Sequence, residues 1–322
     1  MSYAIVFPGQ GAQEVGMGKD LYDGYGVAKD AFDEADEALG FPLSRLIFEG
    51  PEDELVKTAI TQPAILVASI AVTRAVGSEL GKSGKKLAPA FFAGHSLGEY
   101  TALAAAGVIS LRDAVKLVHK RGELMQNAVP LGRGAMAAVL GLELDVVREI
   151  CVEAGGVCSP ANVNAPAQIV VSGDTESVDR AGDIAKSRGA TRVIPLKVSA
   201  PFHCELMRPV ADQLRDEFSG IKWGVPSVPI VANADSSKLE SVTAVQDALY
   251  RQTYSPVMWA DGVTVMASAG VRLFLEFGPG SVLTGLIKRI CKGTGTVTVN
   301  KSADIAKALE ALESVTKPEG AK

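Results

Sequence analysis

The chain has 322 residues, of which 47% are hydrophobic and 21% are charged. This composition is typical of a globular protein with a large buried core, and it excludes an intrinsically disordered chain. The formal net charge is −5, and the densest basic stretch, residues 82–86, is short, so we expect no nucleic-acid partner.

Cysteine and histidine are too sparse to predict a disulfide framework or a metal site. The four cysteines, Cys151, Cys158, Cys204 and Cys291, include no C-x-x-C pair, and the chain has three histidines. We therefore expect reduced thiols and no bound metal.

No segment predicts export or insertion into a membrane. The chain begins with the apolar run Tyr3–Phe7, which has no basic flank and is too short for a signal peptide. No run of about 18 uninterrupted apolar residues occurs, so we expect no membrane span and no membrane partner. These features together predict a cytoplasmic protein.

The first part of the chain alternates between short apolar strands and longer helices. Tyr3–Phe7 is fully apolar and is stopped by Pro8-Gly9, which predicts a buried parallel strand, and Ala88–Ala93 predicts a second one. The helices expected here are Gly26–Leu39, Thr61–Leu80, an alanine-rich helix opening at Gly98, and a helix from the capping sequence Ser110–Asp113 to about Asn127.

The pattern changes between residues 128 and 198. The expected elements are strand Gly134–Leu142, helix Asp145–Ala154, strands Val157–Val163 and Ile169–Ser172, helix Glu176–Arg188 and strand Thr191–Leu196. This β-α-β-β-α-β order predicts a ferredoxin-like α+β small domain inserted into a larger one.

The larger domain resumes at residue 199. Its expected elements are a helix from about Cys204, strand Val228–Ala232, helix Ala244–Thr253, strand Arg272–Phe277, helix Ser281–Ile290 and strand Thr296–Val299. Alternating strands and helices predict an α/β fold, with a mostly parallel sheet covered by helices on both faces. We therefore expect a large domain from residues 1–127 and 199–322, and a small domain from residues 128–198.

The segment Gly94-His95-Ser96-Leu97-Gly98 has the G-x-S-x-G pattern of a nucleophile elbow. It lies between an expected strand and an expected helix, which is the context that such an elbow requires. The tight turn would expose the Ser96 hydroxyl, and the Leu97 amide would face a developing oxyanion. The alternative is a glycine-rich turn with an incidental serine.

A serine nucleophile needs a base, and three histidines are available. His95 precedes Ser96 on a sharp turn, so its side chain should point away from the serine hydroxyl. His119 falls on the polar face of a helix, where we expect it to be exposed. His203 follows an apolar strand and begins a helix, whose positive N-terminal potential would keep the ring neutral; the alternative is a capping or core histidine. The pattern indicates a Ser96–His203 pair with no identifiable third member.

Arg121 lies on the apolar stripe of its helix, between Val118 and Met125. A guanidinium directed into a core is costly unless an anion pairs with it, and arginine matches a carboxylate through two parallel hydrogen bonds. The partner is either a protein carboxylate or the carboxylate of a substrate. In the second case, a serine enzyme would select acyl groups that end in a carboxylate.

Two loops have more than one interpretation. The segment Phe7–Gln13 resembles a dinucleotide-binding fingerprint, but Glu14 stands at the third glycine position and Pro8 interrupts the pattern, so we expect no Rossmann site. Its glutamines could instead donate amide hydrogens to a substrate oxygen. The segment Asn162–Pro166 is either a hairpin turn or a loop that faces the substrate.

Three segments in this order are jointly specific: Phe-Pro-Gly-Gln-Gly from Phe7, Gly-His-Ser-Leu-Gly-Glu-Tyr from Gly94, and Ala-Pro-Phe-His ending at His203. Together they resemble the malonyl-CoA:acyl carrier protein transacylase family of fatty acid synthesis, which is similar to the acyltransferase domains of polyketide synthases. The resemblance extends over essentially the whole chain. It implies an α/β-hydrolase-like core with a ferredoxin-like insertion, in agreement with the element order.

The resemblance also implies a role for each site residue. Ser96 would be the nucleophile, His203 its base, and Arg121 the group that binds the malonyl carboxylate. Gln252, in an Arg-Gln-x-Tyr-x-Pro segment, would orient the histidine as an amide in place of the usual carboxylate. The other residues implied are Gln10 and the Leu97 amide in the oxyanion hole, Met125 and Asn162 in the substrate pocket, and Phe202, which resembles the malonyl-preferring variant of its segment.

The activity implied by the resemblance is transfer of malonyl from malonyl-CoA to the phosphopantetheine thiol of acyl carrier protein, through a malonyl-serine ester. Malonyl-CoA is then a substrate, and we expect no permanently bound cofactor. Three alternatives remain: a stand-alone acyltransferase that serves a polyketide synthase, a serine esterase or thioesterase, and a non-catalytic protein that binds the carrier.

Overall fold

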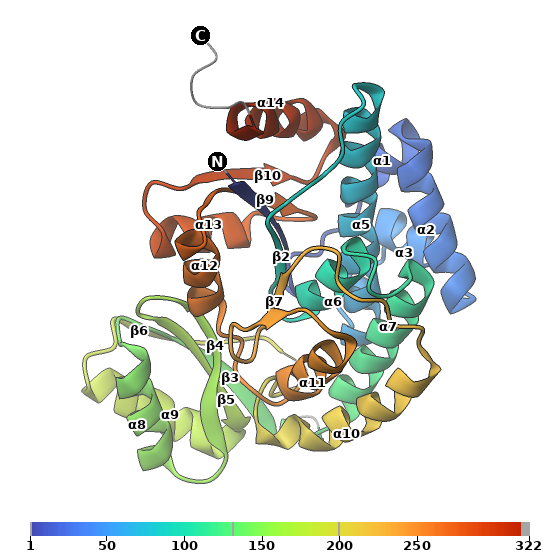
Figure 1. The fold of residues 1–322 in the computed structure, drawn as a ribbon. Helices are drawn as coiled ribbons and strands as arrows, with labels where there is room; N and C mark the ends of the chain where they lie inside the picture. The colour runs from blue at the N-terminus through green and yellow to red at the C-terminus, as the bar shows by residue number, and fades with distance from the viewer. Residues whose placement is uncertain (1, 131, 199, 317–322) are drawn as a thin grey trace.

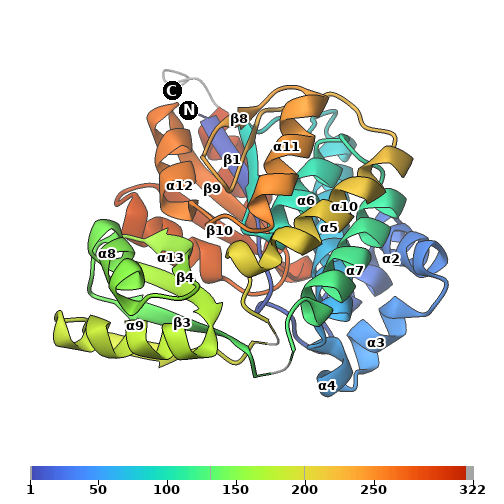
Figure 2. The same ribbon diagram turned by 90° about the horizontal axis from the view of Figure 1, so that it is seen from below.

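The strands of the protein form two separate sheets, one of six strands and one of four. The computed structural model describes residues 2–130, 132–198 and 200–316. In both ribbon views the four-stranded sheet and its two helices lie to one side of the larger body, as the green segment (Figure 1 and Figure 2). The inserted segment therefore packs as a unit beside the sheet into which it is inserted.

The larger sheet is mostly parallel, as predicted. In spatial order its strands are β10 (Gly295–Val299), β9 (Val271–Phe277), β1 (Ser2–Phe7), β2 (Phe91–Gly94), β7 (Ile230–Val231) and β8 (Lys238–Leu239). Among the strand pairs that the structure describes in this sheet, β7–β8 is antiparallel and the others are parallel. The central strand β1 is covered on both faces, which is why its sequence is a continuous apolar run.

Helices cover both faces of this sheet. On one face, α12 (Trp259–Ser268) and α13 (Val282–Ile290) pack against apolar side chains of β1, β2 and β9. On the other face lies a larger apolar cluster. The helices that contribute to it are α1 (Lys19–Gly24), α2 (Gly26–Leu39), α3 (Leu43–Glu49), α4 (Glu52–Leu55), α5 (Thr58–Lys82), α6 (Leu97–Ala105), α7 (Leu111–Asn127), α10 (Arg208–Glu217), α11 (Val242–Gln252) and α14 (Ile305–Thr316).

The central helix of that cluster, α5, is apolar on all sides. Within the described part of the chain it is the one helix that is long and apolar enough to cross a membrane. Most of its residues are buried inside the protein, where α5 contacts α2, α6 and α7. A helix that is apolar all round is expected at the centre of a large core, so packing accounts for the composition of α5.

The four-stranded sheet is antiparallel, with the strand order β4-β5-β3-β6. Its elements in chain order are β3 (Gly134–Leu140), α8 (Leu144–Ala154), β4 (Cys158–Ala165), β5 (Gln168–Asp174), α9 (Thr175–Ser187) and β6 (Arg192–Pro195). Both helices pack on one face through an apolar cluster separate from the main core. The element order confirms the predicted ferredoxin-like unit.

Helices α1, α3, α4, α12 and α14 were not predicted, and one predicted helix starts later than expected. Helix α12 was not predicted, because it has no capping sequence: Met258 precedes it without a side-chain cap. The helix expected from about Cys204 begins as the 3-10 turn Glu205–Met207 and becomes α-helical at Arg208. The later start follows from the backbone of His203, whose φ of 60° is incompatible with a helical turn at that point.

Candidate active site

Strand β2 leads through the predicted elbow into α6, and Ser96 lies at the tip of the turn. The strand starts at Phe91, later than predicted, and ends at Gly94. The backbone of Ser96 has φ 52° and ψ −106°, a strained conformation that costs about 1–3 kcal/mol. Glycine is required on both sides, because a Cβ at Gly94 would overlap the main chain of Gly98, and a Cβ at Gly98 would overlap the carbonyl of Phe7. The turn therefore holds Ser96 at the carboxyl end of the sheet.

The Ser96 hydroxyl lies 2.7 Å from Nε2 of His203. The other ring nitrogen, Nδ1, lies 2.8 Å from the main-chain carbonyl oxygen of Gln252. A carbonyl oxygen only accepts hydrogen bonds, so Nδ1 carries the proton and Nε2 presents its lone pair to the serine. Burial, and then the charge of Arg121, lower the pKa of His203 to about 3, so the ring is neutral and able to accept a proton.

Gln252 contacts His203 through a different group from the one expected. Its main-chain carbonyl meets the ring, whereas its side-chain Oε1 accepts from Nη2 of Arg121 at 2.9 Å and its Nε2 donates to the carbonyl of Ser96 at 2.9 Å. The expectation that the side-chain amide orients the histidine is therefore wrong. The reason is the end of α11 at Gln252, where the last carbonyls of a helix have no intrahelical donor and can accept from the ring.

Arg121 is buried on α7, with 2% of its surface exposed. Its guanidinium donates to Oε1 of Gln62 at 2.7 Å and to Gln252, and its Nη2 lies 3.2 Å from Oγ of Ser96. Within the described residues no Asp or Glu forms an ion pair with this guanidinium, and its Nε has no hydrogen-bond partner. Of the two alternatives left open by the sequence, the structure therefore favours the carboxylate of a substrate.

The other two histidines contact groups other than the serine hydroxyl. His95 lies 2.8 Å from Oδ1 of Asn164, and its ring packs near Trp259. His119 is half-buried rather than fully exposed, because Nδ1 hydrogen-bonds the carbonyl of Ala59 at 2.8 Å and the ring packs on Phe41. Neither ring competes with His203 for the proton of the serine.

A cleft of about 560 Å³ opens at Ser96. Its walls come from both parts of the molecule, because Met136 of β3 in the small unit lines it together with residues of α6 and α7. The predicted oxyanion-hole and pocket residues all line this cleft: Gln10, Leu97, Met125, Asn162 and Phe202. Gln252 is fully buried and lies behind the wall.

Gln10 and Leu97 are placed where amide donors could face an oxyanion. Gln10 follows β1, and its Nε2 lies 3.3 Å from Oγ1 of Thr58. Leu97 is the first residue of α6, and the first amides of a helix have no intrahelical acceptor. Their role in an oxyanion hole stays a prediction that this arrangement supports.

Two buried polar residues beneath the elbow were not predicted as parts of the site. The side chain of Asn233 accepts from the Ser96 N–H at 2.6 Å, and the carboxyl group of Glu99 accepts from Nε2 of Gln252 at 2.8 Å. Burial raises the pKa of Glu99 to about 7. Glu99 had a sequence signal, since it is the one charged residue in the otherwise apolar or uncharged stretch of α6, whereas Asn233 lies in a loop with no distinctive pattern.

The cysteines are not paired in disulfides. All four cysteines are free thiols, and Sγ of Cys151 lies 3.6 Å from Sγ of Cys158 inside the small sheet unit. In the described ranges, no group of three or more His, Cys, Asp or Glu side chains is arranged to hold a metal ion.

An elbow serine beside a neutral histidine forms acyl esters, and a buried arginine next to it suits an acyl group that carries a carboxylate. The fold and the site thus define a serine-dependent acyltransferase of α/β-hydrolase-like architecture. The acyl transferase domain family matches residues 4–310. The chain belongs to this family and, within it, to the malonyl CoA-acyl carrier protein transacylases.

The similarity to known transacylases covers nearly the whole length of both partners. The chain is 48% identical over 310 residues to the malonyl CoA-acyl carrier protein transacylase of Escherichia coli (strain K12), which covers 96% of this chain and 99% of the relative. It is 44% identical to the transacylase of Bacillus subtilis (strain 168), over 96% and 97% of the two chains.

Solved structures agree with this assignment. The acyl carrier protein S-malonyltransferase of Vibrio cholerae superposes with a TM-score of 0.92 at 47% identity, covering 96% of this chain and 100% of that one. A malonyl-transacylase solved in complex with a type II polyketide synthase acyl-carrier protein also gives a TM-score of 0.92, at 46% identity over 97% and 100% of the two chains.

Proposed function

We propose that the chain transfers malonyl from malonyl-CoA to the phosphopantetheine thiol of acyl carrier protein, with Ser96, His203 and Arg121 as its central residues. The observation that carries this proposal is the buried guanidinium of Arg121, which forms no ion pair with a carboxylate among the described residues, Glu99 acting on it only at longer range, and which lies 3.2 Å from Oγ of Ser96. A malonyl group esterified to Ser96 places its free carboxylate a few bond lengths away, within reach of that guanidinium. The names of the relatives support the donor and the acceptor.

In the first half-reaction, Oγ of Ser96 attacks the thioester carbonyl of malonyl-CoA while its proton moves to Nε2 of His203. The amides of Gln10 and Leu97 stabilise the charge that develops on the carbonyl oxygen. The carbon–sulfur bond then breaks, the sulfur of CoA takes the proton from His203, and the malonyl-serine ester remains.

The second half-reaction reverses these steps with a different thiol. His203 accepts the proton of the phosphopantetheine thiol, the sulfur attacks the ester carbonyl, and the bond to Ser96 breaks as the hydroxyl regains its proton. The ester must meet this thiol before it meets water, and its position in a cleft between the small unit and the larger body limits access by bulk solvent.

Binding of the correct acyl group also strengthens the base. The charge of Arg121 is one of the causes that lower the pKa of His203, after burial. A malonyl carboxylate on the guanidinium offsets that charge, so the pKa of His203 rises when a carboxylated acyl group is bound. An uncharged acyl group such as acetyl leaves the base weaker.

Intact-mass spectrometry after mixing with malonyl-CoA tests the proposal. We expect a malonyl adduct on the wild type, much less adduct from acetyl-CoA, and no adduct on Ser96→Ala. A malonyl adduct that persists on Ser96→Ala would exclude Ser96 as the nucleophile. Rapid release of free malonate without a carrier thiol would indicate an esterase, and no adduct on the wild type would indicate a non-catalytic carrier-binding protein.

Service to a polyketide synthase is a second candidate function. The observation that favours it is the similar malonyl-transacylase solved with a polyketide synthase carrier protein. Comparison of kcat/KM for carrier proteins of fatty acid and polyketide synthesis separates the two, and we expect the fatty acid carrier to be preferred.

The proposed chemistry uses only side chains and main-chain groups of the protein, so we propose that malonyl-CoA enters as a substrate and that no resident cofactor is required. We also propose a cytoplasmic location, which the four free thiols support because reduced cysteines are typical of that compartment. Cell fractionation with antibody detection tests the location.

A further inference from the structure

The carboxyl group of Glu99 lies fully buried beneath the elbow, on the first turn of α6. One oxygen, Oε2, accepts two hydrogen bonds: from Nε2 of Gln252 at 2.8 Å and from the main-chain N–H of Asn233 at 3.2 Å. The other oxygen has no partner among the described residues. Burial of a carboxyl group is costly, so its presence here calls for a specific contribution.

The two partners of Glu99, Asn233 and Gln252, contact the two reacting residues, Ser96 and His203. Asn233 holds the serine half, since its Oδ1 accepts from the Ser96 N–H at 2.6 Å and its Nδ2 donates to the carbonyl of Gly94 at 2.7 Å. Gln252 holds the histidine half through its main-chain carbonyl. A single oxygen atom of Glu99 therefore joins the segment that supports Ser96 to the residue that supports His203.

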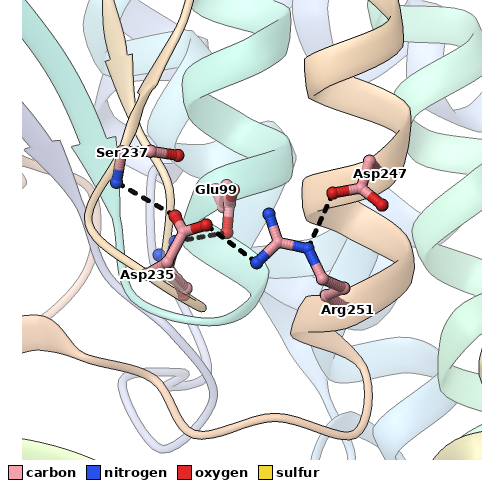
Figure 3. Close-up of polar contacts among 6 residues, drawn as sticks. Glu99, Asp235, Ser237, Asp247 and Arg251 are labelled. Carbon is pink, nitrogen blue, oxygen red and sulfur yellow. Dashed lines mark hydrogen bonds and ion pairs between the residues drawn. The ribbon is translucent and has the colours of Figure 1, made fainter.

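The same two segments are joined a second time at the surface. Figure 3 shows Glu99 beside Asp235, in the loop that follows β7, with Arg251 of α11 reaching across to Asp235. Arg251 forms ion pairs with Asp235 at 2.8 Å and with Asp247 at 2.7 Å, but its side chain is 33% exposed. Exposed ion pairs hold geometry weakly, so the spacing depends on the buried contacts: the link through Glu99 and the bond from Nε2 of Gln252 to the carbonyl of Ser96.

We infer that Glu99 is a positioning residue, which sets the distance between Oγ of Ser96 and Nε2 of His203 by holding Asn233 and Gln252 from one carboxyl oxygen. This inference rests on the proposed function, because acylation of Ser96 is its readout. Glu99 acts as a hydrogen-bond acceptor, so its charge is not required. A glutamine at this position presents a carbonyl oxygen of the same reach and keeps the link.

The test compares Glu99→Ala with Glu99→Gln in the full chain. The rate of malonyl-enzyme formation is measured by rapid quenching and intact-mass spectrometry over a range of malonyl-CoA concentrations. For Glu99→Ala we expect the maximal rate to fall about 100-fold, because small misplacements of reacting groups have effects of that size. The concentration dependence should change little, since Arg121 keeps its bond to Gln62. Glu99→Gln should retain most of the wild-type rate.

Glu276 supplies a matched control for the loss of a buried carboxyl group. It accepts from the main-chain N–H groups of Leu283 and Thr284, at 3.0 Å and 2.7 Å, and so caps α13 rather than supporting the elbow. We expect Glu276→Ala to lower the melting temperature without slowing acylation per folded molecule. Should Glu99→Ala fail to fold, Asn233→Ala tests the same link and should also slow acylation.

The outcomes separate the inference from the function on which it rests. A wild-type rate in folded Glu99→Ala, or in Asn233→Ala, would overturn the positioning role. Equal slowing in Glu99→Gln and Glu99→Ala would overturn it as well, because the charge and not the acceptor would then matter. A wild type that forms no malonyl adduct would overturn the proposed function itself, and this inference with it.

Discussion

Arg121 is the residue on which the choice of acyl group depends. We expect Arg121→Ala to reduce kcat/KM for malonyl transfer about 100-fold or more, because it removes the partner of a carboxylate in a buried site. Transfer of acetyl, which has no carboxylate, should change little. Arg74→Ala is the matched control, since Arg74 pairs with Glu34 at a partly exposed position where an ion pair contributes about 0–1 kcal/mol. Equal losses for malonyl and acetyl would contradict the role of Arg121.

Burial shifts the pKa values of Glu99 and His203 in opposite directions. Burial raises the pKa of Glu99 to about 7, above its unfolded value, so its contribution to stability is present at low pH and is lost as the pH rises through about 7. Burial lowers the pKa of His203 to about 3, so its contribution is present above the unfolded pKa and is lost as the pH falls toward about 3. Between about pH 4.5 and 6.5 the two slopes oppose each other.

Glu99→Gln should isolate the part of this pH dependence that comes from Glu99, because the variant has no ionisable group at this position. Relative to the variant, the wild-type free energy of unfolding is expected to fall by up to about 1.4 kcal/mol per pH unit between about pH 4.5 and 7, because in this range the carboxyl group ionises in the unfolded chain but stays protonated in its buried position. Urea denaturation of both proteins at a series of pH values measures the difference. A difference that does not vary with pH would mean that the pKa of Glu99 is the same in the folded and the unfolded protein.

The sequence identified the reacting residues but not the residues that hold them. Ser96 stands out because it lies in a glycine motif, and Arg121 because it is a charge on an apolar helix stripe. His203 was identified by comparison with the other two histidines. Asn233 gave no such signal, since its role depends on a hydrogen bond to a residue far away in the chain. The group of Gln252 that meets His203 was misjudged for the same reason, because a residue pattern describes side chains and not free carbonyls.

At the scale of elements, the position of Arg121 depends on how closely α7 approaches α5. A Cβ at Gly122 would lie 2.6 Å from Cα of Ala59 and 2.6 Å from the carbonyl oxygen of Thr58, both on α5. Glycine at this position therefore allows the two helices to pack at short range, and it follows Arg121 directly in the sequence.

Gly122→Ala should push α7 away from α5. We expect a loss of about 1–3 kcal/mol in the free energy of unfolding, which is typical of overpacking, and slower malonyl transfer as Arg121 moves. Chemical denaturation measures the first effect and the adduct assay the second. Gly285→Ala on α13 is the control: its Cβ would meet no atom within 4 Å, so it should stabilise the protein by about 0.5–1 kcal/mol. Equal stabilisation by both substitutions would contradict the packing argument.

At the scale of the whole molecule, we propose that residues 1–127 and 199–322 form the large domain and residues 128–198 the small one. All four strands of the antiparallel sheet fall within the second range. Two main-chain hydrogen bonds join β4 to the large body, from Val163 N–H to the carbonyl of Val257 and from Val257 N–H to the carbonyl of Ala161, each 2.9 Å long. The cleft at Ser96 lies between these two parts.

A substrate in this cleft should therefore protect both parts at once. In Ser96→Ala, which should bind malonyl-CoA without reacting, we expect slower amide hydrogen exchange in β4 and in α7 together, because Asn162 of β4 and Arg121 of α7 both line the cleft. Acetyl-CoA should protect α7 less, since it offers no carboxylate to Arg121. Protection confined to one of the two elements would count against a site shared between the parts.

Local patterns in the sequence were sufficient for the parallel and ferredoxin-like sheets, the elbow and the unusual arginine, but not for helices α1, α3, α4, α12 and α14. Apolar periodicity and turn residues act over a few positions, so they can be read without the fold. Only the tertiary structure decided that no described carboxylate pairs with Arg121, that a main-chain carbonyl orients His203, and that Glu99 joins the supports of both reacting residues. These contacts join residues such as Ser96 and Gln252, which are 156 positions apart, and folding alone brings such partners together.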